Sequence, residues 1–239
     1  LLEIAPKAQK EEFRWVEPEG APLKRTALFD EHRKLAKKDF IVPFAGWEMP
    51  VWYVKVSEEH RAVRETAGLF DVSHMGLFEI RGPNAEKFLD TVLSNYVSFM
   101  RDGQSMYAYC CDPDGNVIDD TFTYRLGRER FWMVVNAANN DKMWAWLNGV
   151  NKHKYLIDRE ITSRDIEGEV ELVNLKDPAL GDDRVVNVAL QGPVSLDILL
   201  KVADDAGSKR KLEILQWASF DTVSLAGVEA VVARTGYTG

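Results

Sequence analysis

Gly68-Leu-Phe-Asp-Val-Ser-His-Met-Gly76 is the stretch of this sequence that decides the fold. Its polar, aromatic and apolar side chains follow an order that neither the repeat of a helix nor the two-residue repeat of a strand would select. The stretch therefore predicts a junction built around a site. Two other unusual segments lie within a domain's length of it. They are Val42-Pro-Phe-Ala-Gly-Trp-Glu-Met-Pro-Val51 upstream and Gly115-Asn-Val-Ile-Asp-Asp120 downstream.

Length and charge narrow the class of protein. At 239 residues the chain can bury a substantial core, as one large domain or two smaller ones. Its formal net charge of −8 argues against nucleic-acid binding, because phosphate recognition normally leaves a basic surface. No apolar run approaches the roughly 20 residues of a membrane helix, and the first residues are charged rather than signal-like.

The cysteines predict a reducing compartment. The only two, Cys110 and Cys111, are neighbours, and a disulfide between adjacent positions would be badly strained. Two free thiols favour the cytoplasm. Because neither has an adjacent base in the sequence, a cysteine nucleophile is not favoured.

The chain divides into an extension and a packed region. Residues 1–24 mix charge and proline with little apolar period, which predicts an N-terminal extension that lies on the surface or is poorly ordered. The packed region is expected over residues 25–239. Within it, residues 158–184 carry an acidic excess and weak periodicity, which indicates an insertion.

Helices and strands are expected to alternate along the packed region. Helices are predicted at 26–38, 57–67, 83–93, 140–147, 193–202 and 209–216, and strands at 77–80, 105–110, 121–126, 131–136 and 185–190, with a strand pair over 221–234. Turns such as Asp112-Pro-Asp-Gly115 separate neighbouring strands. The long crossovers of a parallel sheet are missing, so the pattern predicts an α+β fold with largely antiparallel sheets and packed helices.

Several common sites are missing from the sequence. It contains neither a Walker loop nor a dinucleotide-binding Gly-x-Gly-x-x-Gly, and its four histidines lack metal-ligand spacing with cysteine. A site without metal or nucleotide is therefore favoured.

Asp119-Asp120, at the mouth of a predicted strand, is the strongest local candidate for chemistry. The alternation of a strand places Asp120 on the same face as Phe122 and Tyr124, and Asp119 on the opposite face. We therefore expect Asp120 to face an apolar wall and Asp119 to face polar surroundings. A carboxylate beside aromatic rings costs desolvation unless a donor meets it, although an Asp-Asp pair can also be simple turn solvation.

Two neighbouring strands supply companions for Asp120. Trp132, Val134 and Asn136 share one face of the next strand, and Tyr107 and Tyr109 share one face of the preceding strand. Such a set would suit a flat heteroaromatic ligand, with a carboxylate and an amide in reach. Aromatic and β-branched residues at this period also form ordinary cores, so both interpretations stay open.

Two further residues have open roles. His74 is either a base or a hydrogen-bonded structural residue. Tyr237, in the turn Gly236-Tyr-Thr-Gly239, is either a packed tyrosine or a ligand contact.

In this order, eight motifs resemble the T-protein (aminomethyltransferase) family of the glycine cleavage system, within the folate-binding one-carbon transferases. They are Arg25-Thr-Ala-Leu-Phe-Asp30, Pro43-Phe-Ala-Gly-Trp-Glu-Met-Pro50, Glu59-His-Arg-Ala-Val-Arg64, the Gly68–Gly76 stretch, Gly115-Asn-Val-Ile-Asp-Asp120, Val134-Val-Asn-Ala137, Leu190-Gln-Gly-Pro193 and Arg234-Thr-Gly-Tyr-Thr-Gly239. The resemblance covers about residues 25–239.

The resemblance implies a fold and a reaction. It implies the first two domains of a three-domain cloverleaf with tetrahydrofolate at its centre, the C-terminal part of that fold being absent from this sequence. An aminomethyl carbon would pass from a lipoyl carrier protein of the H-protein kind to tetrahydrofolate, giving methylene-tetrahydrofolate and ammonia. Alternatives on the same fold are a folate-dependent demethylase and a non-catalytic folate-binding module for regulation or assembly.

The resemblance also implies residue roles. Asp120 matches the family's essential acid, which agrees with the alternation of the strand. Positions that match folate contacts are Met75, Tyr107, Trp132, Val134, Asn136 and Tyr237. Asp71, Ser73 and His74 are expected to fix the backbone around Met75. No metal is implied.

Overall fold

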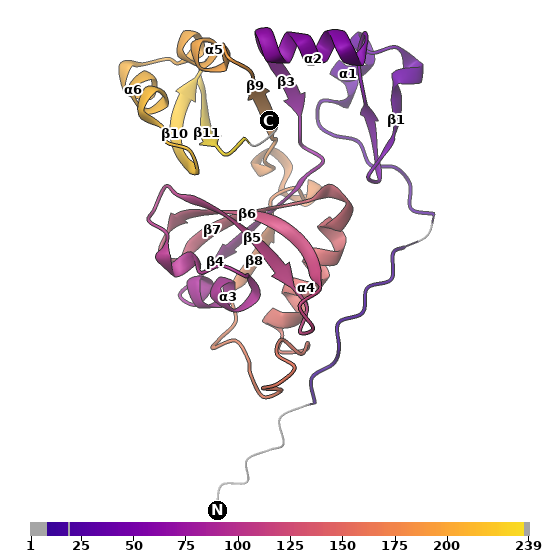
Figure 1. Cartoon of the computed structure of the whole chain (residues 1–239), viewed down its shortest axis with the longest axis vertical. Helices are drawn as coiled ribbons and strands as arrows, with labels where there is room; N and C mark the ends of the chain where they lie inside the picture. The colour runs from indigo at the N-terminus through magenta and orange to yellow at the C-terminus, as the bar shows by residue number, and fades with distance from the viewer. Residues whose placement is uncertain (1–8, 19, 237–239) are drawn as a thin grey trace, which may run out of the picture.

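The computed structural model describes residues 9–18 and 20–236, so Tyr237 lies outside the described residues. Its helices are short, and all pairs of named strands in the described part are antiparallel. The mixture of helices and antiparallel sheets confirms the predicted α+β class. Figure 1 shows a larger lower lobe beneath two smaller upper lobes.

A five-stranded sheet with two helices forms the lower lobe, called here the sheet lobe. The strand order is β5-β6-β7-β4-β8. The bounds are β4 Gly76–Arg81, β5 Ser105–Cys111, β6 Val117–Gly127, β7 Arg130–Val135, β8 Glu171–Asn174, α3 Ala85–Val92 and α4 Asn140–Asn151. The main core, with Phe78, Phe88 and Trp146 almost wholly buried, lies between these helices and the sheet. The other face of the sheet turns toward the upper lobes (Figure 1).

Two smaller lobes stand above the sheet, one on each side of a strand pair. The hairpin lobe contains α1 Phe29–Leu35, β1 Ile41–Phe44, β2 Trp47–Pro50 and α2 Val56–Glu65. The C-terminal lobe contains α5 Ser195–Val202, α6 Ala206–Ile214, β10 Ser219–Leu225 and β11 Val228–Arg234. Between them, β3 Gly68–Asp71 pairs with β9 Val188–Gln191. Short 3-10 turns complete the chain at Lys38–Phe40, Val97–Phe99, Ala137–Asn139 and Pro178–Asp183.

The Gly68–Gly76 stretch is a junction, as the sequence predicts. It leaves the hairpin lobe as β3, crosses to the sheet lobe and enters β4 at Gly76. A Cβ on Gly76 would lie 2.2 Å from Asn140 Oδ1 and 2.4 Å from Val135 Cγ2, so the entry into the sheet is too tight for a larger residue. The stretch thereby sets how the sheet lobe sits under the strand pair.

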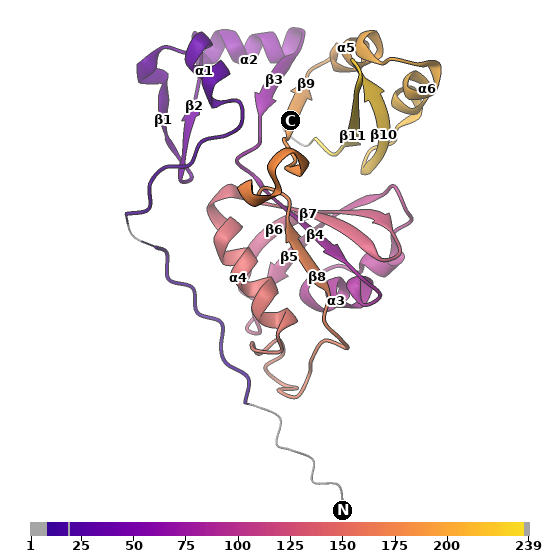
Figure 2. The same cartoon turned by 180° about the vertical axis from the view of Figure 1, so that it is seen from behind.

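Residues 158–184 contain a strand that the sequence pattern did not predict. β8 pairs with β4, with Phe78 opposite Asn174 and Arg81 opposite Glu171, and it forms one edge of the sheet in Figure 2. Its four residues, Glu-Leu-Val-Asn, carry too little periodicity to identify a strand, so its pairing with β4 decides its conformation. Whether the longer segment is an insertion relative to relatives stays a prediction.

Residues 10–13 of the N-terminal extension lie on the sheet lobe. Glu11 pairs with the backbone beside Tyr155, and Phe13 packs edge-on against Trp146 and Tyr155 at ring-centroid distances of 5.2 Å and 5.1 Å. An ion pair between Lys10 and Asp165, at 2.7 Å, fixes the start of the segment. The extension is therefore attached over these residues by an aromatic anchor.

Phe13→Ala is expected to lower the free energy of unfolding of the sheet lobe by about 2 to 3 kcal/mol, because it removes a large ring from a packed aromatic cluster. Chemical denaturation of the variant measures this loss. Val16→Ala is the matched control, since Val16 is 82% exposed in the same segment, and its effect should stay within about 0.5 kcal/mol. An equal effect of the two changes would show that Phe13 is no anchor.

Candidate functional site

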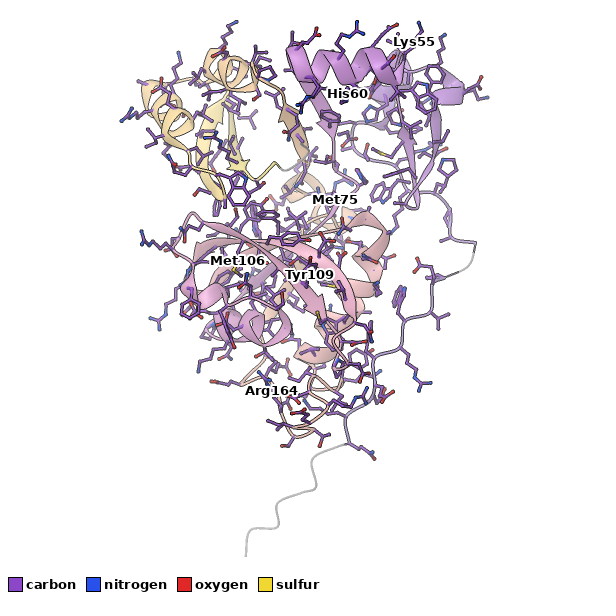
Figure 3. The ribbon with its side chains drawn as sticks, viewed as in Figure 1. Lys55, His60, Met75, Met106, Tyr109 and Arg164 are labelled. Atoms are coloured by element: carbon purple, nitrogen blue, oxygen red, sulfur yellow. The ribbon has the colours of Figure 1, made fainter. Side chains whose placement is uncertain are left out.

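Aromatic side chains gather on the face of the sheet that turns toward the upper lobes. In the register of the strands, Tyr109 lies opposite Asp120, and Tyr107 lies opposite Phe122, which in turn lies opposite Val134. Tyr107 and Tyr109 are 39% and 44% exposed, so this part of the face is open. Figure 3 shows Tyr109 on the sheet and Met75 above it, where the lobes meet.

Asp120 lies on this open face with two donors. Tyr107 donates its hydroxyl to Asp120 Oδ2 at 3.1 Å, and Asn136 Nδ2 donates to Asp120 Oδ1 at 2.9 Å. Tyr107 lies on the neighbouring strand β5, and Asn136 directly follows the end of β7, so the carboxylate is held from both sides of β6. The structure thus brings together Asp120, Tyr107 and Asn136, which the sequence proposed as a group.

Asp119 points to the opposite face and is 2% exposed. Its carboxylate accepts from the backbone N–H of Asn136 at 2.8 Å, from Asn136 Nδ2 at 2.9 Å and from Asn139 Nδ2. The surroundings are polar, as the alternation of the strand predicts, but the depth of burial was not foreseen. Three donors around a buried carboxylate give Asp119 a structural role at the end of β7.

The hydroxyl of Tyr107 keeps its proton at neutral pH. Its hydrogen bond with Tyr109 and its partial desolvation raise the pKa of Tyr107, and the carboxylate of Asp120 adds to the effect. The two tyrosine rings meet edge-on, with centroids 5.5 Å apart. Tyr107 therefore remains a hydrogen-bond donor to Asp120. The tyrosine rings offer an apolar wall to a ligand, and Asp120 offers a hydrogen-bond acceptor.

Trp132 lies farther along the same face. Its indole N–H donates to Glu79 Oε1 at 3.1 Å, and Glu79 also accepts from Arg130. Tyr124, opposite Trp132, meets Phe220 of the C-terminal lobe edge-on at 5.6 Å and shares a hydrogen bond with Thr235. The C-terminal lobe thus closes this end of the aromatic face.

Asp71 and Ser73 fix the backbone beside Met75, as the sequence suggested. Asp71 Oδ1 accepts from the N–H of Ser73 at 2.9 Å, and Ser73 Oγ donates to the carbonyl of Asn187 at 2.9 Å. Met75 N–H closes the turn onto Val72 O at 3.0 Å. Met75 therefore stands on a turn that is tied from two sides.

His74 is packed rather than placed for proton transfer. Its ring meets Phe44 edge-on at 5.8 Å, and its Nδ1 is buried without a hydrogen-bond partner. Burial lowers the pKa of His74, the nearby Lys176 lowers it further, and Asp71 opposes the change. The ring is neutral at pH 7 and acts as a structural group.

Lys176 is a half-buried cation two residues after β8. Its ammonium donates to the carbonyl of Val185 at 3.0 Å and to Asn187 Oδ1. Burial lowers its pKa to about 8, against the attraction of Asp71. The unfolded chain keeps this proton up to its ordinary pKa of 10.5, so between these values the unfolded state binds more protons than the folded state.

The sign of this linkage predicts that stability rises with pH from about 8 to about 10.5 through Lys176. The rise should amount to at most about 3 kcal/mol. Urea unfolding of the wild type and of Lys176→Met at pH 7.5 and pH 10 measures it, because the variant lacks this contribution while other lysines and tyrosines titrate in both proteins. A difference between the two proteins that is the same at both pH values would contradict the assignment.

Other candidate sites in the described residues carry little chemistry. Burial raises the pKa of the Cys110 thiol, which is wholly enclosed and therefore unreactive. Within the described ranges, no group of three or more histidine, cysteine or acidic side chains could hold a metal ion, and no helix is long and apolar enough to cross a membrane. Surface hollows of about 710 Å³ beside α2 and about 420 Å³ beside α1 lie away from Asp120; their lining residues are Val56, Ser57, His60, Arg61 and Arg64, and Arg25, Phe29, Arg33, Ala36, Lys38, Ile41 and Glu48.

The chain matches a known protein family. The family model of the GCVT N-terminal domain matches residues 29–239. An aminomethyltransferase of Symbiobacterium thermophilum is 43% identical over 218 residues, which is 91% of this chain and 52% of that protein. An aminomethyltransferase of Alkaliphilus oremlandii is 40% identical over 217 residues, again 91% of this chain and 52% of the relative. The chain therefore spans about half the length of these curated relatives.

A solved structure shows a similar fold. The crystal structure of glycine cleavage system aminomethyltransferase T from Bartonella henselae has a TM-score of 0.66 and 30% sequence identity, and the match covers 83% of this chain and 47% of that one. The arrangement of a sheet lobe beneath two smaller lobes is thus shared with a protein of known fold.

Proposed function

From the premise that this chain belongs to the family of the GCVT N-terminal domain, we propose that it carries the folate face of an aminomethyltransferase. In the proposed reaction, an aminomethyl carbon passes from the lipoyl arm of a carrier protein of the H-protein kind to tetrahydrofolate. The products are methylene-tetrahydrofolate, ammonia and the reduced lipoyl arm. A cytoplasmic location stays a prediction from the cysteine pattern.

The observation that carries the proposal is Asp120 on the open aromatic face, held by Tyr107 and Asn136. Tetrahydrofolate carries a flat pyrimidine ring fused to a reduced ring, a flat p-aminobenzoyl ring, and N–H donors. The exposed rings of Tyr107 and Tyr109 offer apolar walls to such a ligand, and Asp120 offers an acceptor. Met75, Trp132 and Val134 are proposed as further contacts, and so is Tyr237.

The bonds and protons of the proposed transfer balance without an oxidant. The carbon gives up its bond to sulfur and its bond to the amino nitrogen, and it forms two bonds to folate nitrogens. The two protons displaced from those nitrogens end on the lipoyl sulfur and on the departing amino group, which leaves as ammonia. The protein must therefore hold donor and acceptor close together and help two protons to move.

Asp120 is suited to both tasks. Its carboxylate accepts a hydrogen bond from a folate nitrogen and so fixes that nitrogen beside the incoming carbon, and it eases removal of the proton as the new bond forms. Tyr107 and Asn136 keep the carboxylate on the open face without neutralising it, because both are uncharged donors. Much of the rate gain would come from positioning, since both reactants are already reactive.

Ammonia release from an aminomethyl-lipoyl carrier, measured with and without tetrahydrofolate, tests the proposal in the natural gene product. We expect tetrahydrofolate to accelerate release strongly. Binding of folate without any release would support a non-catalytic module. Turnover of an N-methylated amine in place of the aminomethyl carrier would support a demethylase.

A further inference from the structure

A buried line of side-chain hydrogen bonds runs from the hairpin lobe to the crossing stretch. The hydroxyl of Tyr53 lies 2.7 Å from His32 Nδ1, and His32 Nε2 lies 2.8 Å from Asp71 Oδ2. His32 is 6% exposed and sits on α1, 39 residues before its carboxylate partner. Two short bonds at a buried ring make this one of the best-defined contacts between α1 and β3.

When the His32 ring is neutral, the line has one consistent set of donors. Burial and the neighbouring acids raise the pKa of Tyr53, so its hydroxyl keeps its proton and donates to His32 Nδ1. The other ring nitrogen then donates to Asp71. Burial alone would raise the pKa of Asp71, but the polar groups around it, among them His32 and the N–H of Ser73, outweigh that effect and hold it below its ordinary value. Asp71 is thus a charged acceptor, and His32 is satisfied at both nitrogens.

Asp71 passes this restraint to the turn that carries Met75. One carboxylate oxygen meets His32, and the other accepts the N–H of Ser73 at 2.9 Å. Ser73 in turn bonds to Asn187 in both directions, at 2.9 Å and 3.2 Å. The turn from Val72 to Met75 is therefore held on one side by the hairpin lobe and on the other by the segment that leads into β9.

We propose that His32 is a positioning residue of the folate face, which acts through Asp71 on the turn Val72–Met75 and so sets the place of Met75 above the sheet. The inference rests on the proposed function for its link to folate, and on the hydrogen bonds alone for its link to Met75. An apolar side chain could fill the space of the His32 ring without the cost of burying polar groups. A histidine at this position is explained by the hydrogen bond with which it orients the carboxylate of Asp71.

Three variants of the natural gene product separate positioning from stability. His32→Leu removes both bonds and is expected to raise the KM for tetrahydrofolate about tenfold while kcat changes less than about twofold, because only the folate contact shifts. His32→Gln keeps an amide donor in reach of Asp71 and should restore most of the loss. Tyr53→Phe removes one bond, keeps His32 on Asp71, and should have a smaller effect of the same kind.

Glu86→Leu is the matched control. It leaves the buried Arg125 without one of its two acidic partners, and both Glu86 and Arg125 lie in the sheet lobe, away from the turn. Both this change and His32→Leu leave a buried charged group without a partner, so both should lower the melting temperature, but only His32→Leu should change the KM for tetrahydrofolate. An equal rise of KM in the control would overturn the inference.

A spectroscopic reading of Met75 tests the inference without folate. Labelling the methionine methyl groups with carbon-13 gives one signal for each methionine, six of them from this sequence, and Met75→Leu identifies the signal of Met75. We expect that signal to move in His32→Leu, to move less in Tyr53→Phe, and to stay in place in Glu86→Leu. An unmoved signal in both His32→Leu and Tyr53→Phe would overturn the inference. If the wild type binds no tetrahydrofolate, the proposed function fails while this measurement still decides the link to Met75.

Discussion

Asp120→Asn is expected to lower the rate of methylene-tetrahydrofolate formation about a thousandfold, with a free energy of unfolding within about 0.5 kcal/mol of the wild type. The amide keeps one acceptor oxygen for Tyr107 or Asn136, so the sheet loses little stability. It cannot take up a proton from folate. Quenched assays of carbon transfer measure the rate, and urea denaturation of the same preparation measures the free energy of unfolding.

Asp119→Asn should show the opposite pattern. The amide nitrogen would face donors from Asn136 and Asn139 in a buried place, which costs about 2 to 3 kcal/mol of stability. Transfer by the folded fraction should stay within a few fold of the wild type, since Asp119 points away from the open face. If Asp119→Asn stopped transfer and Asp120→Asn did not, the roles of the two carboxylates would be reversed.

Gly192→Ala is expected to be the most damaging single change to the fold, with a loss of about 3 to 5 kcal/mol. Gly192 has a φ of +119°, and an added Cβ would lie 2.5 Å from Thr66 O and 2.6 Å from Val63 O. Both atoms are backbone oxygens at the end of α2, which cannot move aside as a flexible side chain would. Thermal and chemical denaturation should show a large drop or no folded protein.

Gly82→Ala is the matched control for this prediction. Gly82 and Gly192 each stand between a strand and a proline that leads into a helix, and Gly82 has a nearly equal φ of +115° with nothing within 4 Å of an added Cβ. The control therefore carries backbone strain without a clash and should cost about 1 to 3 kcal/mol. Equal losses in the two variants would mean that contact with the end of α2 contributes nothing.

The sequence predicted the elements whose side chains repeat at the period of their own structure. Apolar and polar side chains alternate clearly along β5, β6 and β7. This alternation predicted which residues share a face and grouped Tyr107 with Asp120. β8 could not be predicted in this way, because its two apolar residues are too few to show an alternation. Its pairing with β4 makes it a strand. Helix bounds also differed, since α1 occupies Phe29–Leu35 of the predicted 26–38.

Contacts between distant parts of the chain were beyond the sequence. Nothing local indicates that His32 meets Asp71 or that Phe13 packs against Trp146. Asp119 was assigned to the correct face, but its burial depends on Asn136 and Asn139, which close over it only after β7 turns back. The candidate site was therefore predictable as a set of side chains on three strands, while its supporting hydrogen bonds were not.

The central claim is that the open face of the sheet receives the aminomethyl carbon on tetrahydrofolate. A lipoyl carrier loaded with a carbon-13 aminomethyl group, mixed with the natural gene product and tetrahydrofolate and followed by nuclear magnetic resonance, tests it most directly. The account predicts that the label appears in the methylene carbon of methylene-tetrahydrofolate, in step with ammonia, and that Asp120→Asn stops both. Label that stays on the carrier, or that leaves at the same rate without tetrahydrofolate, would contradict it.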